Sequence, residues 1–146
     1  MHGNLEALNA CLGHAGEPGA ERFGFLGDLV GYGAGAREVV EVVARYAAAG
    51  AVVLKGNHDE AIEEGGGYFN DAACAALQWA RETLTVEQKD FLASLPLIVR
   101  HETVCFARAS AAAPNGAGIG IGVTSGAGLA YSFGGTLAGA ASPLNI

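Results

Sequence analysis

The chain has 146 residues, of which 51% are hydrophobic, and a formal net charge of −7 with a sequence pI near 4.9. This length suits one domain with a hydrophobic core and is short for two. The acidic balance argues against a general nucleic-acid-binding surface.

A helix is predicted close to the start of the chain. Asn4 suits its N-cap, because an Asn side-chain oxygen accepts a backbone N–H of the first turn. Leu5, Leu8 and Leu12 follow at helical spacing and predict one apolar face. Gly13 is expected to lie near the helix end.

The next elements predict a β-α-β unit. Residues 22–26 and 52–54 read as short buried strands, and residues 36–49 between them read as an amphipathic helix. A right-handed crossover makes the two strands parallel. Asp28 and His58 follow these strands, so we expect both at the same edge of a parallel sheet, where α/β proteins bind ligands.

Two helices are predicted after a glycine-rich hinge. Asp71 is expected to cap a helix over residues 72–83, with Trp79 packed in its interface. Thr85 and Gln88 have the spacing of a capping box, which predicts the start of the second helix.

Residues 97–99 and 103–107 then predict a β-hairpin, with His101 in its turn. The composition changes after Arg108, because residues 109–146 contain no ionisable side chain. Residues 119–123 alternate at period two and favour a strand, which their glycines weaken.

We therefore divide the chain into an α/β domain over residues 1–108 and an uncharged Gly/Ala-rich tail over residues 109–146, which is interpreted as remnant strands of the same domain. A membrane helix over residues 117–140 is the alternative, but its many glycines make it a poor candidate. No membrane partner is expected.

The three cysteines indicate a reducing compartment. Cys11, Cys74 and Cys105 are odd in number, widely spaced and in no CxxC motif, so we expect reduced and buried thiols. No basic and apolar leader is visible at the start. These observations predict a cytoplasmic protein.

Three polar motifs stand out in the chain. They are His2-Gly3-Asn4, Gly27-Asp28 and Gly56-Asn57-His58-Asp59. Their order and spacing, with the intervening sequence to about Arg100, resemble the calcineurin-like metallophosphoesterase family. More narrowly they resemble its small bacterial and archaeal predicted phosphodiesterases, the diadenosine-tetraphosphatase-like branch. The resemblance implies an α/β fold, namely the αββα sandwich of that family, here without its first strand and much of its C-terminal sheet.

The resemblance also implies a site and a reaction. A divalent metal pair, expected to be Mn²⁺ with Fe, Zn or Ni as alternatives, hydrolyses a phosphomonoester or phosphodiester. His2 would bind the first metal, Asp28 both metals, and Asn57 the second. His58 and Asp59 would be the catalytic residues. His58 would face the leaving group as general acid or charge stabiliser, and Asp59 beside it would help to order the loop. The implied partner is a small phosphorylated substrate.

The chain departs from the family pattern at three places. Met1 stands inside the family's Asp-x-His motif, which predicts a truncated chain or a start that lies upstream. Arg108 stands where the family has a metal-binding His, and a guanidinium has no lone pair to offer a cation. Gly135 and Leu137 replace the two His of the last motif.

These departures leave two functional hypotheses open. The first is a metal-dependent phosphoesterase with few protein ligands. The alternative is a catalytically inactive binding or regulatory domain, or a truncated gene product. In either case an unpaired sheet edge would favour self-association into a homo-oligomer.

Overall fold

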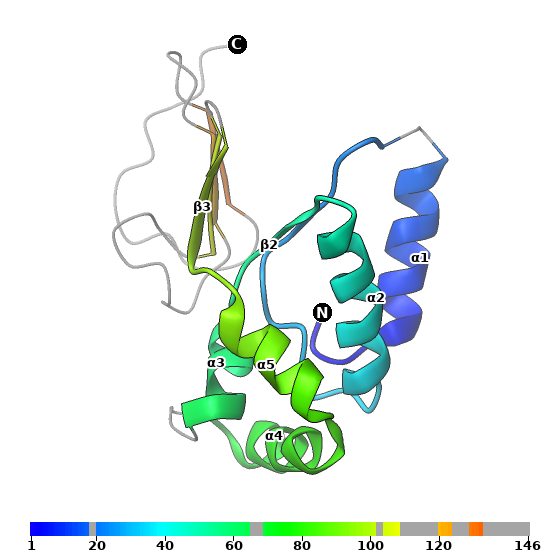
Figure 1. The fold of residues 1–146 in the computed structure, drawn as a ribbon, viewed down its shortest axis with the longest axis vertical. Helices are drawn as coiled ribbons and strands as arrows, with labels where there is room; N and C mark the ends of the chain where they lie inside the picture. The colour runs from blue at the N-terminus through cyan, green and yellow to red at the C-terminus, as the bar shows by residue number, and fades with distance from the viewer. Residues whose placement is uncertain (18–19, 65–68, 102–103, 109–119, 124–128, 133–146) are drawn as a thin grey trace.

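The structure is a computed structural model that describes residues 1–17, 20–64, 69–101, 104–108, 120–123 and 129–132. Its helices and strands alternate along the first half of the chain (Figure 1). In order they are α1 (Leu5–Gly16), β1 (Gly24–Phe25), α2 (Ala36–Ala48), β2 (Val52–Val53), α3 (Asn57–Glu64), α4 (Asp71–Thr83), α5 (Val86–Ser94), β3 (Ile98–His101), β4 (Val104–Ala107), β5 (Gly120–Val123) and β6 (Leu129–Ser132). The α/β class expected from the sequence is confirmed.

The predicted β-α-β unit is present. β1 and β2 pair in parallel, with Gly24 opposite Val52 and Phe25 opposite Val53. Both strands are shorter than predicted, although backbone hydrogen bonds continue the contact to Leu54, whose N–H donates to Phe25 at 2.8 Å. The parallel arrangement brings the loops after β1 and β2 to one edge, as expected.

The second sheet is antiparallel, in the order β3-β4-β5-β6. The predicted hairpin is confirmed, and so is the strand expected at residues 119–123, which is β5. Two details differ from the prediction. His101 ends β3, paired with Val104, and does not lie in the turn, and β6 had no predicted counterpart. Residues 117–140, for which a membrane helix was the less favoured alternative, lie largely outside the described residues.

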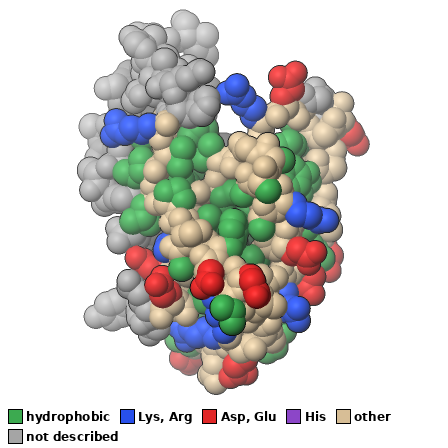
Figure 2. Space-filling view, in the orientation of Figure 1, with side chains coloured by type: hydrophobic (Ala, Val, Ile, Leu, Met, Phe, Trp, Pro, Cys, Tyr) green, Lys and Arg blue, Asp and Glu red, His purple; other side chains and the backbone are tan. Residues whose placement is uncertain are grey.

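The core lies between the helices and the β1–β2 pair. It is built mainly from aliphatic side chains of the loop after β1, of α2 and of the three helices that follow, together with Phe25 of β1. Its most buried members are Leu29, Val30, Ala36, Val39, Val40, Val43, Leu54, Ala61, Ala73, Leu77, Ala80 and Leu92. Figure 2 shows hydrophobic side chains over the middle of the face drawn there, with charged side chains toward its lower end and margins.

The helix caps largely follow the sequence. Asn4 Oδ1 accepts the N–H of Ala7 at 2.9 Å, and Thr85 and Gln88 form the predicted capping box. The cap of α4 is Asn70, whose Oδ1 accepts the N–H of Ala73, so the assignment of Asp71 as the cap was wrong by one residue.

Two expectations about burial were wrong. Trp79 is 41% exposed, because the buried stripe of α4 runs through Ala73, Leu77 and Ala80, at i, i+4 and i+7, and Trp79 falls outside it. Cys11 and Cys74 are exposed, on the outer faces of their helices, and Cys105 alone of the three cysteines is buried. All three are free thiols, as expected.

Candidate metal centre

The N-terminal segment lies along the loop that follows β1. The N–H of His2 donates to the carbonyl of Asp28 at 2.7 Å, and the N–H of Gly3 donates to Leu29 at 2.8 Å. The N–H of Gly33 donates to the carbonyl of His2 at 2.7 Å. These backbone bonds fix His2 next to Asp28 independently of any side-chain contact.

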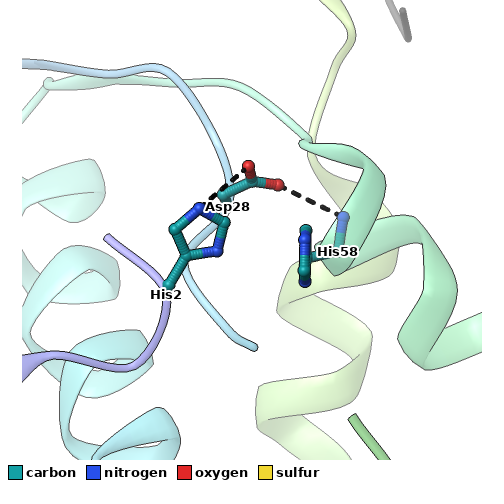
Figure 3. A group of neighbouring side chains, drawn as sticks. All are labelled: His2, Asp28 and His58. Carbon is teal, nitrogen blue, oxygen red and sulfur yellow. Dashed lines mark hydrogen bonds and ion pairs between the residues drawn. The ribbon is translucent and has the colours of Figure 1, made fainter. Parts of the chain in front are cut away.

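Three side chains from separate segments converge at this edge. Ligand atoms of His2, Asp28 and His58 all lie within 4.8 Å of one another. Figure 3 shows the two imidazoles and the carboxylate around a shared space. His2 Nε2 lies 3.5 Å from Asp28 Oδ2, and the backbone N–H of His58 donates to Asp28 Oδ1 at 3.2 Å. The prediction that Asp28 and His58 share one edge is confirmed.

Backbone strain gathers at the same place. Among the described residues, the non-glycine residues with positive φ are His2 (53°), Asp28 (51°) and Tyr32 (39°). A left-handed backbone costs a non-glycine residue about 1–3 kcal/mol, and such strain is found most often at functional sites. The fold therefore holds these residues in place at a cost to stability.

His58 lies at the start of α3, a helix that the sequence reading treated as a loop. Its ring packs against three others, those of His2 at 4.7 Å, Phe69 at 4.8 Å and Tyr32 at 5.3 Å between centroids. Its Nδ1 is buried without a hydrogen-bond partner among the described residues. Nδ1 lies against Gly31, where an added Cβ would collide with it.

Burial lowers the pKa of both imidazoles below the usual value of 6.5, against the opposing effect of the Asp28 charge. Both rings are then neutral near pH 7. A neutral imidazole has the lone pair that metal coordination requires.

Asp59 lies behind the cluster and is only 1% exposed. Its Oδ1 accepts the N–H of Leu29 at 2.9 Å and of Val30 at 3.3 Å, while its Oδ2 accepts the N–H of Gly56 at 2.8 Å. Burial raises its pKa to about 6, although these donors lower it. Its oxygens thus tie the loop after β1 to the turn after β2.

Arg108 completes the site from the end of β4. Its Nη1 donates to Asp28 Oδ1 and its Nη2 to Asp28 Oδ2, in a side-on ion pair. The residue is 5% exposed, and its Nε has no partner among the described residues. The sequence reading singled out Arg108 as a replaced ligand but not as a partner of Asp28.

Two other neighbours were not predicted. Tyr32 is 52% exposed and its ring lies 5.3 Å from those of His2 and His58. Phe69 is the second, with its ring 4.8 Å from that of His58. The GDLVGYG sequence after β1 placed Tyr32 near Asp28 in the chain, but no spacing rule predicts that its ring meets two imidazoles.

Asn57, the predicted ligand of the second metal, is the first residue of α3 and is half-buried.

The donor set fits one divalent cation. Imidazole and carboxylate are common ligands of such ions. Among the described residues Asp28 Oδ2, which lies 3.5 Å from His2 Nε2, accepts one donor, Arg108 Nη2, whereas Oδ1 accepts two. A pair of cations bridged by Asp28 does not fit beside Arg108. Oδ1 already accepts both Arg108 Nη1 and the N–H of His58.

The sequence matches the calcineurin-like phosphoesterase family over residues 1–116. The chain belongs to that family. It is 39% identical to an uncharacterized protein of Methanocaldococcus jannaschii over 101 residues, which are 68% of this chain and 40% of the relative.

Solved structures agree with this assignment. A metallophosphoesterase from Sphaerobacter thermophilus superposes with a TM-score of 0.66 at 35% identity, over 79% of this chain and 46% of that one. A hypothetical protein from Pyrococcus horikoshii gives 0.70 at 24% identity, over 81% and 55%, and shows the fold alone. The chain thus spans 40–55% of the length of these proteins. The metallophosphoesterase fold is confirmed.

In the described part of the chain, no helix combines the length and the apolar character that crossing a bilayer requires.

Proposed function

We propose that this site hydrolyses a phosphate ester with the help of a bound divalent cation. The observation that carries the proposal is the convergence of His2, Asp28 and His58 from three separate segments to within 4.8 Å. When bound, a divalent cation supplies a water of lowered pKa and a positive charge for the phosphoryl oxygens. Mn²⁺ is the ion we expect.

Each residue of the site has a separate role. His2 and Asp28 hold the cation through Nε2 and Oδ2. His58 is neutral near pH 7 and donates a hydrogen bond to the leaving oxygen from its ring N–H. Asp59, buried beneath both loops, positions them and does not meet the substrate. Asn57 is the proposed ligand of any second ion, a role that Arg108 opposes.

We expect the substrate to be a small phosphomonoester or phosphodiester. The exposed ring of Tyr32 is the side chain that the group beyond the phosphate would meet. The free thiols support a reducing compartment, for which we propose the cytoplasm.

The proposal is tested with p-nitrophenyl phosphate and bis(p-nitrophenyl) phosphate, with added Mn²⁺ and after removal of metal by EDTA. His58→Ala should lower the rate by about 100-fold or more, because removing one hydrogen-bond donor aimed at developing negative charge costs about that much in kcat. His14→Ala is the matched control, because His14 is exposed at the end of α1. Equal rates for the two variants, or no dependence on Mn²⁺, would contradict the proposal.

One observation favours a second candidate function, a domain that binds phosphate without turnover. Arg108 holds both oxygens of the carboxylate that the family uses to bridge its metals. Binding of inorganic phosphate by the full chain, with no hydrolysis of either ester at any Mn²⁺ concentration, would favour this reading over the first.

A further inference from the structure

The Arg108–Asp28 pair is buried and geometrically specific. The two side chains are 6% and 8% exposed, and both oxygens of Asp28 accept a guanidinium N–H. A planar guanidinium matches a carboxylate in this side-on manner, whereas an ammonium does not. The pair joins positions 80 residues apart, so the fold and not local sequence brings it together.

The guanidinium of Arg108 packs against the turn at Gly56, next to the Asp28 carboxylate. A Cβ built on Gly56 would meet Arg108 Nη1 and Asp28 Oδ1, so Nη1 packs directly against the turn that carries Asn57. Oδ2 accepts Arg108 Nη2 and also lies 3.5 Å from His2 Nε2. Arg108 Nη1 therefore lies between Asp28 Oδ1 and the turn at Gly56, whereas the His2 ring approaches the carboxylate at Oδ2.

Both charge and coordination exclude a cation from the Arg108 side. A permanent positive charge next to the carboxylate repels a divalent ion, and burial weakens the screening of that repulsion. The Arg108 Nη1 and His58 N–H donors also occupy Asp28 Oδ1. Arginine cannot relieve the repulsion by losing its proton.

The arginine keeps donors for an anion. Nη1 and Nη2 each retain one N–H after bonding Asp28, and the buried Nε has no partner among the described residues. A guanidinium with free donors is a preferred partner of phosphate.

We propose that Arg108 takes the place of a second cation, so that the site holds one divalent ion, between His2 and Asp28, and one fixed guanidinium. The guanidinium then supplies the second positive charge facing the substrate phosphate. This inference rests on the proposed function, because it assigns the partners of the same carboxylate.

The test counts Mn²⁺ ions per chain by elemental analysis after equilibrium dialysis, which requires no activity. The full chain is compared with Arg108→His, which offers a ligand in place of the charge, and with Arg108→Lys, which keeps the charge. Arg100→His is the matched control, because Arg100 is exposed on β3. Thermal unfolding of each variant shows which of them are folded, and Arg108→Lys serves if Arg108→His is not.

We expect one ion for the wild type, for Arg108→Lys and for Arg100→His, and two for Arg108→His. Two ions in the wild type would overturn the inference while leaving the proposed function standing, and so would a single ion in a folded Arg108→His. Should Arg108→His not fold, two ions in Arg108→Lys would equally overturn it. No ion in the wild type would overturn both the inference and the proposed function, even if Arg108→His bound one or more ions. No ion in any folded variant would overturn both.

Discussion

The carboxylate of Asp59 accepts the backbone N–H of Leu29 at 2.9 Å, and its other oxygen accepts that of Gly56 at 2.8 Å. This single side chain therefore joins the loop that carries Asp28 to the turn that precedes His58. The distance between two of the three clustered side chains depends on it.

Replacing Asp59 by Ala should destabilise the protein by about 3 kcal/mol or more, because it leaves three buried N–H groups without acceptors. Urea unfolding measures the effect. Asp90→Ala, on the exposed face of α5, is the control and should change the free energy of unfolding by no more than about 0.5 kcal/mol. Similar values for the two variants would show that Asp59 does not join the loops.

The stability contribution of Asp59 should also depend on pH. Burial raises its pKa from 3.8 to about 6, so the folded state holds this proton more tightly than the unfolded state. Its contribution to the free energy of unfolding therefore increases as the pH falls through 6 toward 3.8.

Between pH 7 and 4.5 the stability of the wild type relative to Asp59→Asn should rise by about 2 kcal/mol. Urea unfolding of both metal-free proteins across this range measures it. Burial lowers the pKa of His2 and of His58, so these residues change the free energy of unfolding with pH in the opposite direction. Both are present in the two proteins, so their effect cancels in the difference. A difference that does not vary with pH would refute the assignment.

We expect that no larger residue can replace Gly31 without destabilising the fold and displacing the His58 ring. Its φ is 102°, and a Cβ there would collide with the ring of His58. Gly31→Ala should therefore destabilise the fold by about 2 kcal/mol and displace the imidazole. Gly13→Ala, at a helical position where nothing lies within 4 Å of the added Cβ, should stabilise by up to about 1 kcal/mol. Thermal unfolding distinguishes the two, and a Gly31→Ala variant as stable as the wild type would contradict this account.

The buried ion pair should show strong coupling. Asp28→Asn leaves the Arg108 charge uncompensated, and Arg108→Gln does the same to Asp28, so each should cost about 3–5 kcal/mol. The double variant should cost less than the sum of the two, because neither charge then remains buried alone. Urea unfolding of the four proteins measures the coupling, and additive costs would show that the pair does not form.

The sequence predicted the elements whose signals are local. The capping box at Thr85 and Gln88 and the alternation of strand and helix around α2 needed only neighbouring residues. α3 was missed because its first turn is polar and contains the motif itself, which was interpreted as a loop. In hindsight, Asp59 and Glu60 are acidic residues of the kind that favour a helix N-terminus.

The site was predictable to the extent that a parallel sheet brings its strand ends together. That rule placed Asp28 and His58 at one edge, and the family resemblance added His2. It did not place Arg108 on Asp28, because a contact across 80 residues depends on how the second sheet packs beside the first. The contacts of the Tyr32 ring with His2 and His58 were also missed, because they depend on how three separate segments pack together.

The most direct test of the central claim is a crystal structure of the full chain grown with Mn²⁺, using anomalous scattering to locate the ion. We predict one anomalous peak between His2 Nε2 and Asp28 Oδ2, with the guanidinium of Arg108 still paired with Asp28. No peak beside Asp28, or two peaks bridged by Asp28 with Arg108 displaced, would contradict the account.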